Sequence, residues 1–295
     1  MKDKDFSNET RAALLVQALP YIQRFRGKTI VVKYGGNAMQ SDELKKAVID
    51  DVILMACVGI RTVLVHGGGP EIEAMLKKTG KESRFVNGLR YTDEETMDIV
   101  QMVLCGKVNK EITALIEKSG GRAIGLSGID GAMLKARRIN GDLGMVGDIE
   151  SVDASMLNSI MDSGIIPVVS SVAYGIDTDG TGADEGKPLN INADTAAAKI
   201  AASLKAEKLV LMTDVCGILR DVQDESSLIR EVTRLQLDDL KKEGVLSKGM
   251  IPKADCCALA LDGGVKKAHI LDGRLPHAIL IELFTDEGIG TMIIH

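Results

Sequence analysis

The sequence lacks several features that mark common classes of protein. It has no tryptophan, aromatic residues make up only 3% of its 295 residues, and its five cysteines are odd in number and form no C-x-x-C pair. This cysteine usage is typical of a reducing cytoplasm rather than of a disulfide framework or a zinc site. The longest apolar run, residues 52–60, is far shorter than the roughly 18 residues of a membrane span. We therefore expect a cytoplasmic protein with no membrane partner.

Positive charge is also scarce, since 36 Lys and Arg residues stand against 42 Asp and Glu residues and leave a net charge of −6. This balance offers no general attraction to nucleic acid, so small-molecule chemistry is the better expectation. Glycine, by contrast, is abundant at 31 residues, and 45% of the chain is hydrophobic. We expect an aliphatic core, loops with special backbone conformations, and about two domains.

Short, continuously apolar runs alternate with amphipathic stretches along the chain. The apolar runs are 29–32, 62–65, 165–169 and 208–212, and helical patterns cover 42–58, 94–118 and 193–206. Strands of this kind suit a parallel sheet that is covered on both faces, so the alternation predicts a doubly wound α/β fold. A boundary near Ala206 separates residues 27–206 from residues 207–295. The aperiodic segment 175–189, rich in Gly and Asp, is predicted to be an exposed hairpin or loop.

A separate amphipathic segment precedes the first strand. Four apolar residues, among them Leu15 and Phe25, share one helical face, and Pro20 is expected to kink the helix. We treat residues 1–26 as an N-terminal helical unit. The pattern leaves open whether its apolar face packs on its own domain or on another subunit.

Two predicted strands end in glycine-rich turns that lead into helices. The first strand runs into Lys-Tyr-Gly-Gly-Asn at 33–37, and the second into His-Gly-Gly-Gly-Pro at 66–70. Backbone N–H groups at such turns, with the positive ends of helix dipoles, predict an anion site at one edge of the sheet. Neither turn matches the P-loop or the dinucleotide fingerprint.

Charged residues near this edge are candidates for the chemistry. Lys33 closes an apolar strand, where a lysine either needs a partner charge or extends its ammonium to water. Lys253 lies in a second cationic segment, and Asp194 opens a predicted helix, where it either orients the lysines or complements the helix dipole. Thr213 and Asp214 follow another strand and are suited to contact a ribose, a phosphate or hydrated Mg²⁺.

Taken together, these motifs resemble those of the amino-acid kinase family. General signs are the K-x-G-G strand end at 33–36 and the T-D-x-x-G-I turn at 213–218. More specific strings, at 87–90 (Asn-Gly-Leu-Arg), at 190–194 (Asn-Ile-Asn-Ala-Asp) and over 249–291, resemble the branch that acts on N-acetyl-L-glutamate. The resemblance extends from Thr29 to the end of the chain. It implies a three-layer αβα sandwich around a mainly parallel sheet, in two lobes.

The resemblance also implies an activity, namely ATP-dependent phosphorylation of the γ-carboxylate of N-acetyl-L-glutamate in arginine biosynthesis, with Mg²⁺ carried by the nucleotide. A carboxylate acceptor is already ionised at neutral pH, so the difficulty is electrostatic and no general base is needed. By resemblance, Lys33 and Lys253 stabilise the transferring oxygens and Asp194 holds both lysines. The implied acceptor-binding residues are Gly68, Gly69, Arg90 and Asn190, and the implied nucleotide-binding residues are Gly35, Gly36, Thr213, Asp214, Gly217, Leu219 and Met250.

Regulation and assembly are implied in the same way. Arginine-inhibited members of the family resemble this chain in having a helix before the first strand, which links dimers into a hexamer, a trimer of dimers. The resemblance puts an arginine site near His277, Glu287 and Gly288. Two alternatives stay open: another acyl-phosphate kinase, acting on glutamate or carbamate, and a non-catalytic sensor of arginine or nucleotide.

Overall fold

The computed structural model describes residues 6–39, 41–86, 88–139, 141, 143–177, 180–246 and 249–295. Its helices are α1 (Asn8–Phe25), α2 (Asp42–Cys57), α3 (Gly69–Lys78), α4 (Glu94–Gln101), α5 (Asn109–Lys118), α6 (Ser155–Asp162), α7 (Ala193–Ser203), α8 (Arg234–Lys242), α9 (Ile251–Asp262) and α10 (Ala278–Phe284). A π-helical segment, η2 (Met102–Val108), joins α4 to α5, and short 3₁₀ turns are η1 (Gly36–Met39), η3 (Asp130–Ala132) and η4 (Glu225–Ser227). The strands are β1 (Thr29–Tyr34), β2 (Arg61–His66), β3 (Phe85–Val86), β4 (Leu89–Arg90), β5 (Ala123–Gly128), β6 (Leu134–Arg138), β7 (Gly147–Val152), β8 (Ile166–Gly175), β9 (Pro188–Asn190), β10 (Lys208–Thr213), β11 (Glu231–Thr233), β12 (Lys267–Asp272) and β13 (Thr291–Ile294).

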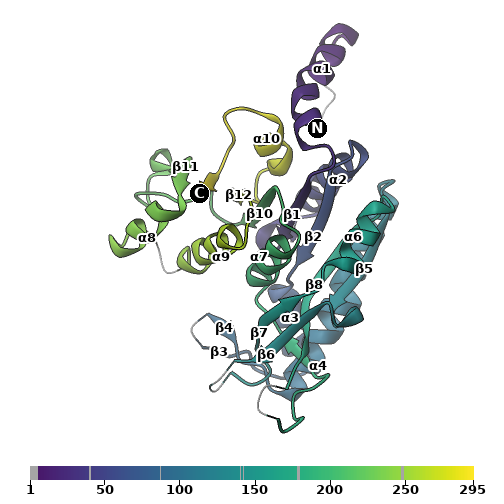
Figure 1. Cartoon of the computed structure of the whole chain (residues 1–295), viewed down its shortest axis with the longest axis vertical. Coiled ribbons are helices and arrows are strands. Elements are labelled where there is room, and N and C mark those ends of the chain that lie inside the picture. Colours follow the sequence, from purple (N-terminus) through teal and green to yellow (C-terminus); the bar gives the residue numbers. More distant parts are fainter. Residues whose placement is uncertain are drawn as a thin grey trace.

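One large sheet runs through the molecule in the order β11-β13-β12-β10-β1-β2-β8-β6-β7, with β5 and β9 also paired to β8 (Figure 1). Its centre is parallel, and β1 lies between β2 and β10. The consecutive residues Ile30, Val31 and Val32 point to alternate faces and are all fully buried, so both faces of the sheet are covered. The predicted α/β fold with a mainly parallel sheet is therefore confirmed.

The two predicted lobes share this sheet. The strands β1, β2 and β8 come from residues 27–206, whereas β10, β12 and β13 come from residues 207–295. The join is the parallel pairing of β1 with β10, in which Lys33 stands opposite Leu211. Residues from both halves of the chain consequently meet along one sheet edge, where the strands β1, β2 and β10 all end.

The apolar pattern did not predict two antiparallel hairpins, one at the edge of the large sheet and one that forms a separate two-stranded sheet. The strands β6 and β7 pair antiparallel, as do the two-residue strands β3 and β4. These strands are short and partly exposed, so they carry no continuous apolar run. Within the segment 175–189, the end of β8 and the start of β9 flank an exposed stretch, and residues 178–179 lie outside the described residues. Leu189, the last residue of this segment, is fully buried in β9.

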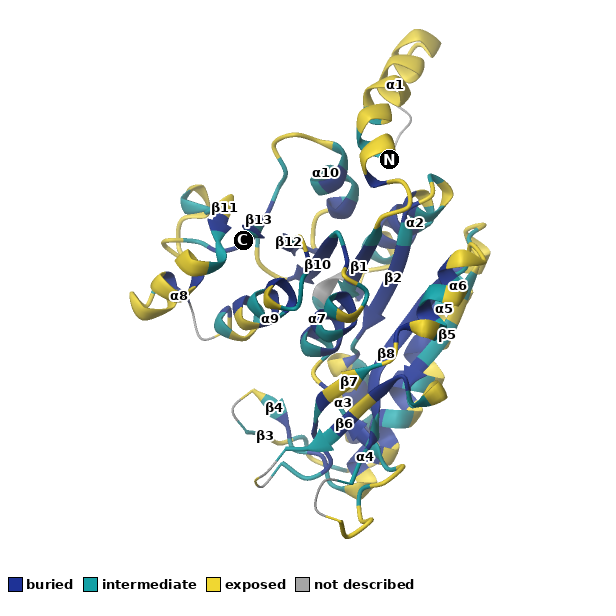
Figure 2. Cartoon of the chain, viewed as in Figure 1, coloured by how far each residue is buried: buried dark blue, intermediate teal, exposed yellow. Residues whose placement is uncertain are grey.

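The first helix, α1, extends away from the rest of the chain (Figure 2). It continues through Pro20, and only its last turns pack on the molecule. Phe25 is buried, and Tyr21 meets the ring of Phe284 in α10 edge-on and donates a 2.7 Å hydrogen bond to Asp286 Oδ1. At the other end Leu15 keeps 75% of its surface exposed. In the described part of the chain, no helix is both long enough and apolar enough to cross a membrane.

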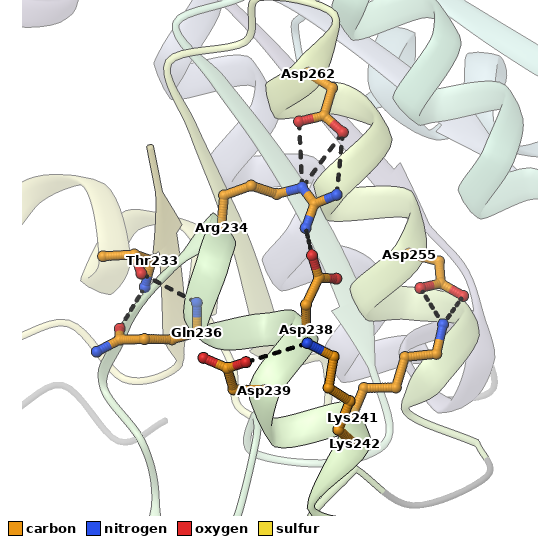
Figure 3. A network of polar contacts seen from close by, with 9 residues as sticks. All are labelled: Thr233, Arg234, Gln236, Asp238, Asp239, Lys241, Lys242, Asp255 and Asp262. Carbon is orange, nitrogen blue, oxygen red and sulfur yellow. Dashed lines mark hydrogen bonds and ion pairs between the residues drawn. The ribbon is translucent and has the colours of Figure 1, made fainter.

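A network of ion pairs joins α8 to α9 (Figure 3). Arg234 contacts Asp262 at 3.2 Å and Asp238 at 2.8 Å, and Lys241 contacts Asp255 at 2.9 Å. Each of these pairs is partly exposed, so each contributes little to the free energy of unfolding. Their structural effect is to fix α8 along α9, whose first turn carries a lysine of the site described next.

Candidate active site

A cavity of about 310 Å³ lies at the sheet edge where β1 and β2 end. Both glycine-rich turns line it, together with Lys33, Arg90, Asn190 and Asp194. Three of these residues are separated by more than 50 positions in the sequence. Lys33 comes from the parallel strand β1, Arg90 from the separate β3–β4 hairpin, and Asn190 from β9, which pairs antiparallel with β8. The anion site predicted from the two turns thus corresponds to a real cavity.

Asp194 forms ion pairs with both predicted lysines. Its Oδ1 lies 3.0 Å from Lys33 Nζ, and its Oδ2 lies 3.3 Å from Lys253 Nζ. The carboxylate stands in the first turn of α7 because Asn192 caps that helix, accepting a 2.9 Å hydrogen bond from the Asp194 N–H. Lys253 comes from the first turn of α9, which packs on α7. Two cations are therefore held side by side on one buried anion.

The charge state of Asp194 follows from this pairing. Burial by itself would raise the pKa of the carboxyl, but the charges of Lys33 and Lys253 outweigh burial and lower the pKa below 3.8. The cluster consequently carries a net charge of +1 at neutral pH. Asp194 also lies in the first turn of α7, so it complements the helix dipole as well as pairing with the two lysines.

Glycine is favoured at several positions of the two turns. Gly36 has φ +66°, a left-handed conformation, and a Cβ on it would lie 2.6 Å from Asp214 Oδ1. A Cβ on Gly35 would lie 2.9 Å from Lys33 Nζ, and one on Gly68 would lie 2.7 Å from Leu104 Cδ2, so these side chains would have to shift. Because glycine has no side chain, the backbone of both turns borders the cavity and its N–H groups can approach an anion.

Arg90 reaches the cavity from β4. Its guanidinium is largely buried, pairs with Glu73 Oε2 at 3.0 Å, donates to Ser83 Oγ, and lies 4.7 Å from the centre of the Phe85 ring. The Asn190 side chain donates a 3.1 Å hydrogen bond to Thr92 Oγ1. Sequence reasoning missed these supporting partners, because nothing in their spacing links them to residue 90 or residue 190.

The predicted nucleotide-binding residues occupy a separate region. Gly217, Leu219 and Met250 line a small cavity of about 40 Å³ in the C-terminal half. Thr213 is buried and its hydroxyl is bonded within its own turn to the backbone of Val215. Asp214 contacts the first glycine-rich turn at Gly36 and so connects this region to the larger cavity.

A third cavity, of about 260 Å³, lies between the end of α1 and the C-terminal half of the sheet. Glu287 and Gly288 line it, but His277 does not: His277 Nδ1 lies 2.6 Å from Asp51 Oδ1, away from this cavity. The structure thus separates His277 from the two residues with which the sequence grouped it.

Three further polar residues line this third cavity, namely the buried Lys208 and His269 and the partly buried Glu282. Lys208 Nζ lies 2.9 Å from His269 Nε2, and His269 Nδ1 lies 2.7 Å from Glu282 Oε1. Burial lowers the pKa of Lys208 to about 8 and that of His269 to about 4, so the imidazole is neutral and donates to Glu282. Sequence reasoning missed this cluster, although a lysine and a histidine inside apolar strands are a signal that could have revealed it.

A mainly parallel α/β sheet with two glycine-rich turns, and with two lysines on one buried carboxylate at its edge, is the architecture of a phosphotransferase with an anionic substrate. The model of the amino acid kinase family matches residues 28–272, and the chain belongs to this family.

Individual relatives are similar over nearly the whole chain. An acetylglutamate kinase from Clostridium beijerinckii is 58% identical over 285 residues, covering 96% of this chain and 98% of the relative. Among solved structures, N-acetylglutamate synthase from Neisseria gonorrhoeae in complex with coenzyme A and N-acetyl-glutamate superposes with a TM-score of 0.82 at 30% identity. The match covers 96% of this chain but 63% of the synthase. The same synthase in complex with coenzyme A and L-arginine gives a TM-score of 0.78 at 28% identity.

Proposed function

We propose that this protein transfers the γ-phosphoryl group of ATP to the γ-carboxylate of N-acetyl-L-glutamate, giving N-acetylglutamyl 5-phosphate and ADP. The observation that carries the proposal is the pairing of Lys33 and Lys253 on Asp194 beside a cavity that also contains Arg90. The high identity to acetylglutamate kinases over almost the full length supports the choice of acceptor. We further propose that the enzyme acts in the cytoplasm, as a step of arginine biosynthesis.

The reaction follows from the charges of the site. An ionised carboxylate oxygen of the acceptor forms a bond to the γ-phosphorus, and the bond from that phosphorus to the bridging oxygen breaks, leaving ADP. Both reactants are anionic, so Lys33 and Lys253 offset their repulsion and stabilise the charge that spreads over the transferring oxygens. No proton has to be removed from the acceptor, which agrees with a site built from cations and backbone N–H groups.

Each substrate has a proposed place. The acceptor occupies the 310 Å³ cavity, with its α-carboxylate on Arg90, its amide near Asn190 and its γ-carboxylate against the turn at Gly68 and Gly69. ATP extends from Gly35 and Gly36, past Thr213 and Asp214, to the region of Gly217, Leu219 and Met250. Mg²⁺ enters bound to the ATP phosphates, because this ion keeps several waters and usually binds with nucleotide.

Replacing Arg90 by Ala should mainly weaken binding of the acceptor. We expect the KM for N-acetyl-L-glutamate to rise about 30- to 100-fold, the equivalent of a charge-assisted pair, while the KM for ATP changes by less than about threefold. Steady-state kinetics with each substrate varied in turn measures both. Arg90→Lys is the matched control, because it keeps the charge but loses the planar fork of the guanidinium. Its KM for N-acetyl-L-glutamate should lie between those of wild type and Arg90→Ala. A rise confined to the KM for ATP would assign Arg90 to the nucleotide instead.

An acceptor panel separates the proposed reaction from its alternatives. With ATP and Mg²⁺, ADP release is measured with N-acetyl-L-glutamate, L-glutamate and carbamate as acceptors. A free ammonium would approach Lys33 and Arg90, so we expect kcat/KM for L-glutamate to be lower by about 100-fold or more. Preferred turnover of glutamate or carbamate would replace the proposed acceptor, and ADP release with none of them would favour the non-catalytic sensor.

We also propose that arginine inhibits the enzyme by binding in the cavity beside α1. Glu282 is a buried carboxylate suited to a guanidinium, and Lys208 lies near enough to receive the α-carboxylate of an amino acid. The related synthase was crystallised with L-arginine, which supports this choice of ligand. Glu287 and Gly288 remain in the proposed site, whereas His277 lies outside the cavity lining.

The exposed half of α1 is the proposed contact between copies of the chain. Deleting residues 1–26 removes the apolar surface around Leu15 and also Tyr21 and Phe25, which border the proposed arginine site. We expect an active dimer with weakened arginine inhibition in place of a hexamer, a trimer of dimers. Light scattering with activity assays measures both effects. The variant Leu15→Asp, which keeps Phe25, is the control that separates assembly from the arginine site, and hexamers retained after the deletion would refute the contact.

A further inference from the structure

Two buried polar side chains lie directly beneath the second glycine-rich turn, and the mechanism above does not use them. His66 is the last residue of β2 and Asn109 the first residue of α5, and their exposed fractions are 0% and 1%. His66 Nε2 lies 3.0 Å from Asn109 Nδ2. Buried polar groups destabilise a fold unless they are hydrogen-bonded.

The main-chain partners determine the direction of each hydrogen bond. His66 Nδ1 lies 2.9 Å from Gly67 O, and because a carbonyl oxygen only accepts, Nδ1 carries the proton. Burial lowers the pKa of His66 to about 4, which leaves the ring neutral with a lone pair on Nε2. Asn109 Nδ2 lies 3.2 Å from Leu126 O and 2.9 Å from Val168 O, so its nitrogen is the atom that faces Nε2. Asn109 therefore selects the tautomer in which His66 donates to Gly67.

The oxygen that accepts this bond belongs to the peptide that joins Gly67 to Gly68. A trans peptide points its carbonyl oxygen and its N–H in opposite directions. With the Gly67 oxygen directed at the buried ring, the Gly68 N–H points to the opposite side, and both glycines line the active-site cavity. Within the described residues, the Gly68 N–H has no hydrogen-bond acceptor. It is thus a donor available to an anion in the cavity.

The turn depends on neighbouring side chains to keep this orientation. Three consecutive glycines have the widest choice of backbone conformations, so their own sequence does not define one. The π-helical segment η2 packs against the turn, since a Cβ on Gly68 would lie 2.7 Å from Leu104 Cδ2 and 3.3 Å from Val108 Cγ2. The same helical stretch that supplies Asn109 therefore also packs on Gly68, and π-helical segments are frequent at functional sites.

We propose that His66 and Asn109 are positioning residues, which hold the Gly67–Gly68 peptide so that the Gly68 N–H donates to the oxygens of the transferring phosphoryl group. This inference rests on the proposed kinase function, because it requires a phosphoryl anion in the cavity. A donor that is already oriented needs no reorganisation while negative charge builds up on those oxygens. Neither side chain touches a substrate, and their effect reaches the reaction through Gly67.

A matched pair of substitutions separates this role from packing. In His66→Asn the amide nitrogen can stand close to the position of Nδ1 and donate to Gly67, whereas in His66→Gln the amide stands close to Nε2 and the Gly67 oxygen loses its donor. We expect kcat to fall about 10- to 100-fold in His66→Gln and less than about fivefold in His66→Asn. The KM values for both substrates should stay within about threefold of wild type, because the donor acts mainly in the transition state.

Binding of ADP with aluminium fluoride, a mimic of the transferring phosphoryl group, gives a second readout without any acceptor. The dissociation constant of this complex, measured by calorimetry, should rise in His66→Gln by about the same factor as kcat falls. The affinity for ADP alone is the control, and an unchanged value shows that the site is folded. In Asn109→Asp the side chain accepts a hydrogen bond where asparagine donates one, which reverses the tautomer of His66. We expect the same loss of kcat and of affinity for the analogue. This variant tests the positioning role if His66→Gln does not fold.

The outcomes are distinguishable. Equal losses in His66→Asn and His66→Gln, or wild-type kcat and analogue affinity in His66→Gln or Asn109→Asp, would overturn the positioning role. Failure of the wild-type protein to phosphorylate N-acetyl-L-glutamate would refute the proposed acceptor. If the affinity for ADP with aluminium fluoride still followed the expected order across wild type and the variants, the positioning role would be supported nonetheless.

Discussion

Replacing Lys253 by Met lowers kcat by about 10²- to 10³-fold and raises the KM for ATP by less than about fivefold, if the proposed mechanism holds. The ammonium of Lys253 lies 3.3 Å from Oδ2 of Asp194, which lines the cavity, and methionine keeps the length of the side chain without its charge. The loss falls on kcat because the lysine acts mostly on charge that develops during transfer, while other groups also bind the nucleotide. Steady-state kinetics with ATP varied at saturating acceptor measures it.

The chain offers a matched control for this prediction in a second lysine–aspartate pair that involves α9. Lys241 of α8 pairs with Asp255 of α9 at 2.9 Å (Figure 3). This pair is more exposed than the pair of Lys253 with Asp194, and neither of its residues lines the cavity. Lys241→Met removes one lysine–aspartate pair on α9, as Lys253→Met does, and should change kcat by less than about twofold, since exposed pairs contribute little. Similar losses in both variants would mean that α9 has been disturbed, and unchanged turnover in Lys253→Met would remove this lysine from the mechanism.

The second large effect is expected for Asp194→Asn. The amide has the size of the carboxylate but leaves Lys33 and Lys253 near each other without a buried counter-charge, so the two ammonium groups repel and shift. We expect kcat to fall by about 10²- to 10³-fold. The midpoint of thermal unfolding should also drop, and differential scanning calorimetry measures it. Asp255→Asn, which breaks the exposed pair with Lys241, is the control and should change neither quantity appreciably.

The pH dependence of stability gives Asp194→Asn a further test. The folded protein lowers the pKa of Asp194 below 3.8, so its stabilising contribution is present above about pH 4 and disappears as pH falls through the lowered value. The difference in free energy of unfolding between wild type and Asp194→Asn should therefore be largest near neutral pH and shrink below about pH 4. A difference that stays constant into the acid range would show that Asp194 is not held as a carboxylate by the lysines.

Part of the site could be predicted from sequence because it depends on local chain geometry. A glycine-rich turn after an apolar strand requires a backbone conformation that only glycine adopts freely, and Lys33 is adjacent to such a turn. Asp194 follows the helix cap Asn192, a relation that spans two residues. Arg90 and Lys253 could be singled out only through their motifs, since nothing local reveals which cavity their side chains approach.

Other parts of the site have no local signal at all. The bond between His66 and Asn109 joins residues 43 positions apart. It exists because α5, which follows the π-helical segment η2, packs on β5 and β8, and β8 pairs with β2. The cluster of Lys208, His269 and Glu282 likewise forms only when β10 pairs with β12 and α10 folds back. Such contacts depend on strand order and helix packing, which apolar periodicity does not specify.

By itself the sequence determined the alternation of strands and helices, the two glycine-rich turns and their position at strand ends, because those features follow from periodicity and from backbone conformations within a few residues. Only the tertiary structure decided which charges meet. The parallel pairing of β1 with β2 and β10 brings Lys33 to the edge where α7 and α9 present Asp194 and Lys253. The fold also pairs His277 with Asp51 of α2, outside the lining of the cavity that Glu287 borders. The physical reason is that ion pairs and hydrogen bonds act over a few ångströms, whereas the residues that make them are brought that close by the packing of the whole chain.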